Sequence, residues 1–293
     1  MDGLLLVDKP AGWTSHDVVA KLRGLTKERQ IGHLGTLDPL ATGVLPLALG
    51  AATRLIEFAP HDKQYRAGCR LGMTTDSEDV TGKILAESST DQLEEGAVRE
   101  ALLSLTRLTQ QVPPMVSALK KGGKRLYELA REGKSVERAP RPIRVTRLEV
   151  LELRLPHVAF LVDCSGGTYV RSLCREVGEK LGVGGCLESL RRTRSGSFTL
   201  DQCQSLEELQ KAAAAGNLSG HLRPAQELVA PWPAVAPGEE ALRRFCQGQA
   251  LAAPGAPEGP TRVVNAQGRL VGMALVAGGA LKPQKVFGMD GIA

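Results

Sequence analysis

Apolar and polar residues follow the period of a β-strand in three stretches of the chain. Residues 3–7, GLLLV, form a short apolar run and predict a buried strand that ends at the turn sequence DKPAG. Residues 64–72, QYRAGCRLG, alternate and predict a strand that stops at Gly72. Residues 157–164, HVAFLVDC, are apolar enough for a strand in the centre of a sheet.

Three other stretches have apolar residues at helical spacing. The first helix is predicted after Ser15 and the third after Thr168, because both residue types cap helix N-termini. The second is predicted from about Asp91 to Leu105. The apolar face of the first comprises Val18, Val19, Leu22 and Leu25. The face of the second comprises Leu93, Ala97, Ala101, Leu102 and Leu105, and that of the third comprises Val170, Leu173, Cys174, Val177 and Leu181.

Arg171 lies in the first turn of the third predicted helix, off its apolar face. A cation is unusual there, because the helix dipole favours negative groups at the N-terminus. We therefore expect a partner carboxylate close to Arg171.

The length and composition of the chain predict two domains and a cytoplasmic protein. A chain of 293 residues exceeds the usual size of one domain, and from about Trp232 it becomes rich in Pro and Gly with short strands and an NAQG hairpin turn. We therefore expect a larger domain over 1–230 and a small β-rich domain over 231–293. Neither a signal region nor a membrane-length apolar run is present, and the six cysteines lack metal-site spacing, which indicates reduced thiols and no metal site.

Positive charge is concentrated in one segment. The net charge is +5, yet residues 117–147 contain ten Lys and Arg against three Glu, a local balance of +7. So many cations with few apolar residues cannot form a core, and Gly133 limits the helix RLYELAREG to a short one. We expect an exposed, hairpin-like basic insertion over about 112–147. It is either a solvated charge run or a surface for the phosphates of a nucleic acid.

The stretch GHLGTLDPLATGVLPLALG contains a single carboxylate, Asp38. By itself, Asp38 followed by Pro39 favours a turn or a helix cap. Four pieces taken together change that interpretation: DKPAGWTSHDVV, GHLGTLDPLATGVLPLALG, KQYRAGCRLGMTTDSEDVTG and CSGGTYVRSLCREVGEKLG. In this order they closely resemble the bacterial tRNA pseudouridine-55 synthases, the TruB family. The resemblance covers roughly residues 3–200, and the last sixty residues resemble, more weakly, the family's RNA-binding PUA domain.

The resemblance implies an α+β fold with a mixed, largely antiparallel sheet flanked by helices. The sequence agrees, because it lacks the regular strand and helix alternation of a doubly wound fold. The implied activity is isomerisation of uridine-55 in the tRNA T loop, in which the bond from N1 to the ribose breaks and the base rejoins through C5. This chemistry requires no cofactor. The implied partner is the T arm of tRNA, with no protein partner and a monomeric enzyme.

The resemblance assigns catalytic positions to Asp38, Arg171 and Tyr65. Asp38 matches the catalytic aspartate, acting either as nucleophile at C1′ or as the base that starts elimination. Arg171 is implied as its ion-pair partner, and Tyr65 as the aromatic that stacks on the flipped base. By sequence pattern alone, Tyr65 is equally a half-buried core aromatic.

Further matches line the pocket or bind the RNA. His33 matches the histidine that fills the vacated space in the RNA, although a histidine beside Gly is often a turn residue. Tyr169 and Leu190 match pocket positions but also suit a helix start and a core. Lys9 matches a position near the site and equally suits a solvated turn. In the insertion, the residues expected to contact phosphates are Lys120, Lys121, Lys124 and Arg125.

The chain departs from the family pattern at two positions. Leu34 stands where a small residue is usual, and Val116 where an aromatic residue is common, so the contacts at both positions stay open. Two other functions are also open: a tRNA-folding chaperone with incidental catalysis, and a relative that acts on ribosomal or guide-directed RNA with protein partners. The compact insertion argues against the second of these.

Overall fold

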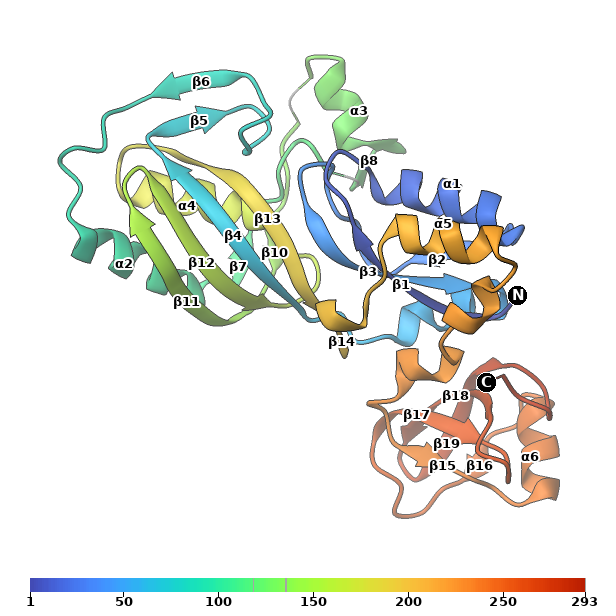
Figure 1. Ribbon diagram of the computed structural model, residues 1–293. Helices are drawn as coiled ribbons and strands as arrows, with labels where there is room; N and C mark the ends of the chain where they lie inside the picture. The colour runs from blue at the N-terminus through green and yellow to red at the C-terminus, as the bar shows by residue number, and fades with distance from the viewer. Residues whose placement is uncertain (118, 135, 293) are drawn as a thin grey trace. The chain divides into compact units, whose positions relative to one another are not determined.

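The computed structural model describes residues 1–117, 119–134 and 136–292, and within these ranges the side chains of Lys121, Arg125 and Arg131 are outside the description. The chain divides into two compact units (Figure 1). Unit 1 comprises residues 1–39, 43–61 and 195–293, and unit 2 comprises residues 40–42 and 62–194. Within the described ranges, no helix has the length and apolar character needed to cross a membrane.

Three strands form the N-terminal part of unit 1. Strand β1 (Gly3–Lys9) pairs antiparallel with β3 (Thr42–Leu49), from Gly3 opposite Leu49 to Lys9 opposite Gly43. Strand β2 (Ile31–His33) pairs antiparallel with the end of β3. The predicted buried strand at residues 3–7 is confirmed and continues to Lys9, because the backbone of β3 pairs with it along its whole length.

The first predicted helix is confirmed as α1 (Ser15–Thr26), but its cap was predicted one residue too late. Thr14 is the N-cap: its hydroxyl accepts from the Asp17 N–H, and the Asp17 carboxylate accepts from the Thr14 N–H. This reciprocal capping box satisfies the first helical donors better than a lone serine. Ser15 is instead fully buried in the first turn.

The C-terminal strands form a five-stranded sheet in the order β15, β17, β18, β19, β16. Their bounds are Ala234–Val235 for β15, Leu251–Ala252 for β16, Gly259–Val264 for β17, Leu270–Ala277 for β18 and Ala280–Val286 for β19. Helix α6 (Glu239–Cys246) packs Leu242 and Phe245 into the core of this sheet. The predicted NAQG turn is confirmed, because the Asn265 carboxamide accepts from the backbones of Gln267 and Arg269 and joins β17 to β18.

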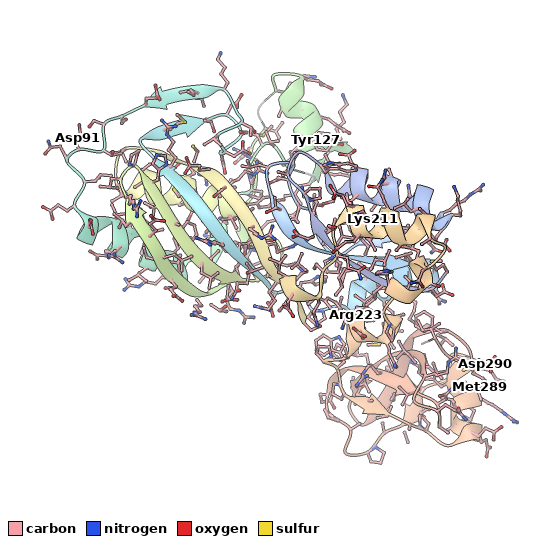
Figure 2. All side chains as sticks on the ribbon, viewed as in Figure 1. Asp91, Tyr127, Lys211, Arg223, Met289 and Asp290 are labelled. Atoms are coloured by element: carbon pink, nitrogen blue, oxygen red, sulfur yellow. The ribbon has the colours of Figure 1, made fainter. Side chains whose placement is uncertain are left out.

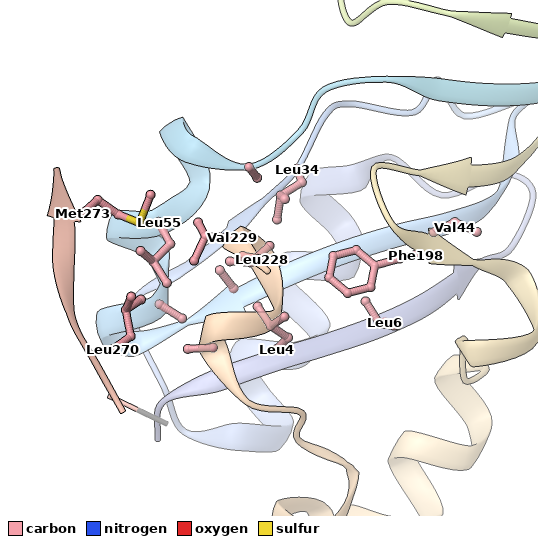
Figure 3. Close-up of a cluster of buried hydrophobic side chains, with 14 residues drawn as sticks. Leu4, Leu6, Leu34, Val44, Leu55, Phe198, Leu228, Val229, Leu270 and Met273 are labelled. Atoms are coloured by element: carbon pink, nitrogen blue, oxygen red, sulfur yellow. The ribbon is translucent and has the colours of Figure 1, made fainter. Parts of the chain in front are cut away.

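This C-terminal sheet shares a hydrophobic core with the N-terminal strands of unit 1 (Figure 3). Leu270 and Met273 of β18 pack in one buried cluster with Leu4 of β1, and η1 (Gly50–Phe58) and η5 (Ala225–Val229) contribute to it. The Trp232 indole N–H also donates to the Phe58 carbonyl at 2.6 Å. The remaining elements of unit 1 are β14 (Phe198–Thr199), η3 (Leu200–Gln202), α5 (Leu206–Ala214) and η4 (Leu218–His221).

Unit 2 is built around β4 (Lys63–Leu71), which lies between β12 (His157–Cys164) and β13 (Gly185–Ser195). Strand β12 pairs antiparallel with β4 and with β11 (Val145–Arg154), so the predicted central strand is confirmed. The alternation predicted for residues 64–72 is confirmed by β4, whose odd-numbered residues are buried. A short hairpin, β5 (Met73–Thr75) and β6 (Ile84–Glu87), follows.

The two helices of the unit 2 sheet differ from their predicted starts. Helix α2 (Glu95–Ser104) begins four residues later than predicted and continues as η2 (Leu105–Arg107). It buries Val98 in place of the predicted Ala97, which is exposed. Helix α4 (Val170–Lys180) has Tyr169 as its N-cap without a side-chain hydrogen bond, so the predicted Thr168 cap is wrong.

The basic insertion leaves and re-enters unit 2 through the pair β7 (Gln110–Gln111) and β10 (Arg141–Pro142). Its hairpin pairs β8 (Lys120–Lys121) with β9 (Lys124–Arg125) across Gly122 and Gly123, which have φ values of 59° and 84°. Glycine adopts such positive φ angles at little cost in free energy, because it has no Cβ. Helix α3 (Leu126–Arg131) follows and ends before Gly133, so the predicted hairpin and short helix are confirmed.

Candidate active site

The loop that carries Asp38 connects β2 to β3 and is anchored on both sides of the carboxylate. Before it, the Leu37 N–H donates to Ser15 Oγ at 2.8 Å, and the Ser15 hydroxyl lies 3.3 Å from the Leu37 carbonyl that accepts from it. After it, the Pro39 carbonyl accepts from the Gly12 N–H at 2.8 Å. Asp38 is half-buried. Helix α1 and the turn after β1 therefore hold the backbone of this acid on both sides.

Lys9 is part of the same anchoring region and is completely buried. Its ammonium group donates to the Trp13 carbonyl at 2.6 Å and to the Pro10 carbonyl at 2.9 Å. The interpretation of Lys9 as a solvated turn lysine is therefore wrong. Its contacts close the turn between β1 and α1, from which Gly12 reaches the Asp38 loop.

His33 and Leu34 precede that loop. His33 is half-buried opposite Leu47 of β3, and its ring meets the His16 ring edge to face, with centroids 5.5 Å apart. Leu34 is 4% exposed and belongs to the core cluster of unit 1 (Figure 3). The bulky residue at position 34 is thus accommodated by the core, and its N–H donates to the Pro46 carbonyl.

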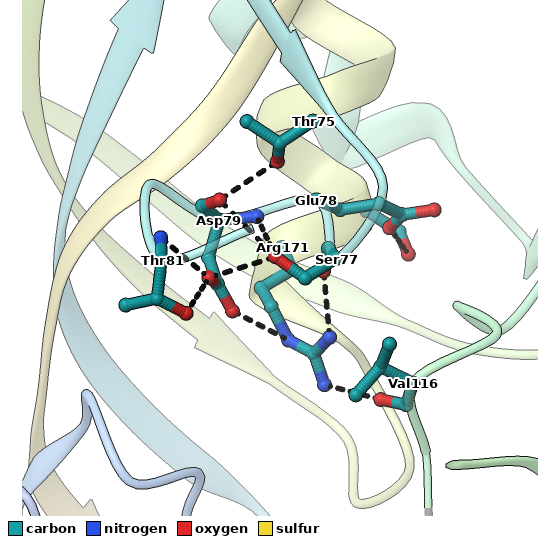
Figure 4. A network of polar contacts seen from close by, with 8 residues as sticks. Thr75, Ser77, Glu78, Asp79, Thr81, Val116 and Arg171 are labelled. Atoms are coloured by element: carbon teal, nitrogen blue, oxygen red, sulfur yellow. Dashed lines mark hydrogen bonds and ion pairs between the residues drawn. The ribbon is translucent and has the colours of Figure 1, made fainter. Parts of the chain in front are cut away.

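Arg171 is buried in unit 2, with 3% of its surface exposed (Figure 4). Its two terminal nitrogens donate to the Ser77 and Val116 carbonyls, each at 2.8 Å. Its Nε lies 4.0 Å from a carboxylate oxygen of Asp79. The expectation of a carboxylate near Arg171 is confirmed by Asp79, whereas pairing with Asp38, which belongs to unit 1, stays a prediction. At Val116 the contact uses the backbone carbonyl, so it does not depend on an aromatic side chain.

Asp79 is itself fixed within the loop 76–81. One carboxylate oxygen accepts from the Thr81 N–H at 3.0 Å, the Thr81 hydroxyl at 2.5 Å and the Ser77 hydroxyl at 2.9 Å. The Thr75 hydroxyl donates to the Asp79 carbonyl at 2.7 Å. The sequence analysis did not select Asp79, although the residue lies within the motif KQYRAGCRLGMTTDSEDVTG. Its local signal is an aspartate flanked at two residues on each side by hydroxyl residues, the pattern of an Asx turn.

The predicted pocket residues of unit 2 lie on its strands and at the start of α4. Tyr65 is on the buried face of β4, opposite Val162 of β12, and is 7% exposed. Leu190 of β13 is 8% exposed. Tyr169 is half-buried, and the carboxamide of Gln111 holds its backbone, accepting from its N–H at 2.9 Å and donating to its carbonyl at 3.1 Å. Gln111 was missed because nothing in its local sequence separates it from a surface glutamine.

Lys63 shares the buried face of β4 with Tyr65, and it is 5% exposed. Burial, reinforced by the charge of Arg192, lowers the pKa of Lys63 to about 7. Above pH 7 the folded protein releases this proton, whereas the unfolded chain keeps it until its ordinary pKa of 10.5. Since the unfolded state then binds more protons, this group makes stability rise with pH across that window.

We expect Lys63→Met to remove that part of the pH dependence. Between pH 7 and pH 8.5 the free energy of unfolding of the wild type should rise by about 1.6 kcal/mol relative to the variant. Urea denaturation of both proteins at the two pH values measures it, and the comparison cancels the contribution of buried thiols such as Cys164. An identical pH dependence in the two proteins would mean that Lys63 keeps its proton.

Two of the described lysines of the insertion form ion pairs with a glutamate of the same segment. Lys120 and Lys124 are exposed, and Glu132 accepts from Lys124 at 2.9 Å and from Lys134 at 2.7 Å. Hydrogen bonds from Lys134 and Lys124 lower the pKa of Glu132 to about 2. Lys121 and Arg125 lie on the same hairpin by their backbones, while their side chains fall outside the description. Tyr127 of α3, labelled in Figure 2, donates its N–H to the Ser117 carbonyl.

The six cysteines are free thiols, four of them buried. In the described part of the chain, no group of three or more His, Cys, Asp or Glu side chains is arranged to hold a metal ion.

Comparison with known proteins gives a consistent family assignment. Residues 23–170 match the TruB family pseudouridylate synthase (N terminal domain), residues 171–230 the tRNA pseudouridylate synthase B C-terminal domain, and residues 233–287 the Pseudouridine synthase II TruB, C-terminal. A protein of Synechococcus sp. named tRNA pseudouridine synthase B is 44% identical over 98% of both chains. Another of that name, from Heliobacterium mobile, is 50% identical over 74% of this chain and 72% of its own.

Solved structures agree with the sequence comparisons. A chain of the crystal structure of a Cbf5-Nop10-Gar1 complex matches with a TM-score of 0.74 and 27% identity, over 98% of this chain and 85% of that one. Together these findings define an RNA pseudouridine synthase with the expected mixed fold. The chain belongs to the TruB family.

Proposed function

We propose that this enzyme converts uridine-55 in the T loop of tRNA to pseudouridine. The observation that carries the proposal is the 44% identity, over 98% of both chains, to a relative named tRNA pseudouridine synthase B. The solved structures of Cbf5 complexes are more distant, at 27% identity. A tRNA substrate is therefore better supported than a guide-directed RNA.

The first step of the proposed reaction extrudes the uridine from the folded T loop. Unstacking the base costs a few kcal/mol, and stacking on the Tyr65 ring returns about 1 to 3 kcal/mol. His33 fills the space that the base leaves in the RNA, and Tyr169 and Leu190 line the pocket.

Asp38 then acts on the ribose, either by attack at C1′ or by removing the proton that starts elimination. The N1 bond to the ribose breaks, the uracil turns, and C5 forms the new bond. Arg171 is proposed as the cation that forms an ion pair with Asp38. The contacts of Arg171 with Ser77, Val116 and Asp79 support a positioned guanidinium, because each fixes a different edge of the group.

The reaction is tested by tritium release from C5-labelled uridine in T-arm RNA. We expect release at position 55 in single-turnover experiments with the wild type. A matched RNA with cytidine at position 55 and label at its other uridines should release none. Equal release from the two RNAs would contradict the assignment of position 55.

In the proposed complex, the basic insertion binds the phosphates of the T arm. Exchanging Lys120, Lys121, Lys124 and Arg125 together for Gln should weaken tRNA binding, because each phosphate contact releases counterions. The slope of log Kd against log salt should fall by about 3 for four contacts. Fluorescence anisotropy at several salt concentrations measures the slope, and an unchanged slope would exclude these residues from the interface.

Glu132→Gln provides a control for which the opposite change in tRNA affinity is expected. Glu132 pairs with Lys124 and Lys134, so RNA phosphates must compete with it for these two cations. Removing the carboxylate should tighten tRNA binding by a few-fold and steepen its salt dependence. Weaker binding would show that Glu132 organises the insertion for RNA rather than competing with it.

In this proposal a single chain acts on tRNA in the cytoplasm and needs no protein partner. Residues 1–230 serve as the catalytic domain and residues 231–293 as an additional RNA-binding domain of the PUA kind. The match of residues 233–287 to a TruB C-terminal family supports this last assignment.

A further inference from the structure

Glu78 lies between the two residues that contact Arg171 from the loop 76–81. Its neighbours are Ser77, whose carbonyl accepts from Arg171, and Asp79, whose carboxylate faces the Arg171 Nε. In the network of Figure 4 no contact joins Glu78 to Arg171. The Glu78 side chain points to the other side of the loop. Its backbone has φ = 63°, in the left-handed region that a residue with a Cβ rarely adopts.

The Glu78 side chain is clamped to helix α4. One carboxylate oxygen accepts from the Ser172 hydroxyl at 2.6 Å and the other from Arg175 at 2.8 Å. Ser172 is completely buried, and the side chains of Glu78 and Arg175 are 11% and 22% exposed. A charge-assisted contact of this geometry is strong where little water competes for it.

The backbone of Glu78 is held as well. Its carbonyl accepts from the Leu187 N–H of β13 at 3.0 Å, and the Leu187 carbonyl accepts from the Val80 N–H at 2.9 Å. The loop is therefore fixed to a strand by its backbone and to α4 by one carboxylate. A left-handed residue persists when its surroundings determine its conformation in this way.

The two residues of α4 that contact Glu78 are close to Arg171 along the helix. Ser172 follows Arg171 directly, and Arg175 lies one turn later on the same helix. The helix that carries the guanidinium is thus tied, through Glu78, to the loop that supplies a carbonyl and a carboxylate to that guanidinium. A shift of the loop against α4 would change both contacts of Arg171 together.

We propose that Glu78 is a positioning residue, which sets the orientation of Arg171 by locking the loop 76–81 onto helix α4. The expected effect of the loop on the reaction rate rests on the proposed function, because it assumes that Arg171 takes part in catalysis. The expected effect of Glu78 on the position of the loop is independent of the proposed function.

The test compares Glu78→Asn with the wild type. Asparagine tolerates the left-handed backbone, but its side chain is one methylene too short for the clamp. Single-turnover tritium release at saturating T-arm RNA should slow by about 10- to 100-fold, as for other small misplacements of catalytic groups. The Kd for the RNA should stay within about twofold. A merely structural role would lower the melting temperature without this split between rate and binding.

Amide exchange reports on the loop independently of activity. The Thr81 N–H donates to the Asp79 carboxylate, so its exchange should accelerate in Glu78→Asn if the clamp holds the loop. Unchanged exchange at Thr81 would overturn the proposal. If the wild type released no tritium from the RNA, the proposed function would fail, while this measurement would still decide whether Glu78 positions the loop.

Two further variants complete the experiment. Glu179→Gln is the matched control, because Glu179 lies 3.4 Å from the same Arg175 but is 62% exposed and is not part of the loop. It should behave like the wild type, and an equal slowing in this variant would contradict the proposal. Arg175→Met removes the Arg175 contact with Glu78 and leaves the Ser172 contact in place. Its rate loss should not add to that of Glu78→Asn, because Glu78→Asn already breaks the contact with Arg175.

Discussion

Asp38→Asn is expected to abolish pseudouridine formation while leaving tRNA binding intact. The amide has nearly the shape of the carboxylate, but it is neither a nucleophile nor a base at neutral pH. Loss of such a group should slow tritium release from uridine-55 by at least about 10³-fold. The backbone contacts that anchor the loop, at Leu37 and Pro39, involve no Asp38 side-chain atom and should survive.

Two measurements decide the outcome for Asp38. Single-turnover tritium release gives the rate, and anisotropy with labelled T-arm RNA gives the Kd, which should change by less than about threefold. Continued conversion by the variant would refute the role of Asp38. A variant that cannot isomerise uridine but still promotes tRNA folding as well as the wild type would give weight to the chaperone function.

Arg171→Lys is expected to have the second largest effect. The guanidinium of Arg171 reaches the Ser77 carbonyl, the Val116 carbonyl and the Asp79 carboxylate with three different nitrogens. A lysine ammonium is a single point on a flexible stem and cannot bridge the three positions. At least one part-buried acceptor loses its donor, which should cost about 1 kcal/mol of the free energy of unfolding. The rate of isomerisation should fall by about 10²-fold.

Arg223→Lys is a suitable control for the chemical change itself. Arg223, labelled in Figure 2, pairs with Glu227 at 2.7 Å, and both side chains are about one-third exposed. Urea denaturation and single-turnover rates of this variant should match the wild type, because exposed ion pairs contribute little. If Arg171→Lys were as active as the wild type, the fixed geometry of the guanidinium would be irrelevant to the reaction.

Strong local patterns made much of the fold predictable. The apolar run at residues 3–7 and the alternation at residues 64–72 are properties of a few neighbouring side chains, and both strands formed as predicted. Helix ends were less predictable, since Ser15 and Thr168 each have the chemistry of a cap. Thr14 is the N-cap of α1 because Asp17 completes a capping box with it. Tyr169 is the N-cap of α4, and the carboxamide of Gln111 in β7 holds its backbone.

The resemblance selected Asp38 in GTLDP and Arg171 in TYVRS, and the catalytic roles of both stay predictions. The contacts that hold these residues could not be predicted where they come from distant parts of the chain. Asp79 and Gln111 act through residues about 90 and 58 positions away, and neither has a local sequence that separates it from loop or surface residues. Leu34 showed the converse: an unusual residue inside a motif proved to be an ordinary member of the core.

The core shared by β1 and β18 also constrains when the protein can fold during synthesis. Leu4 leaves the ribosome long before Leu270 and Met273, which complete its cluster and lie about 270 residues later in the chain. At about 5 to 20 residues per second, roughly 15 to 50 s separate the two. Over that time the apolar face of the N-terminal strands lacks its final cover, so nascent and prematurely terminated chains should be targets for chaperones and proteases that bind exposed apolar segments.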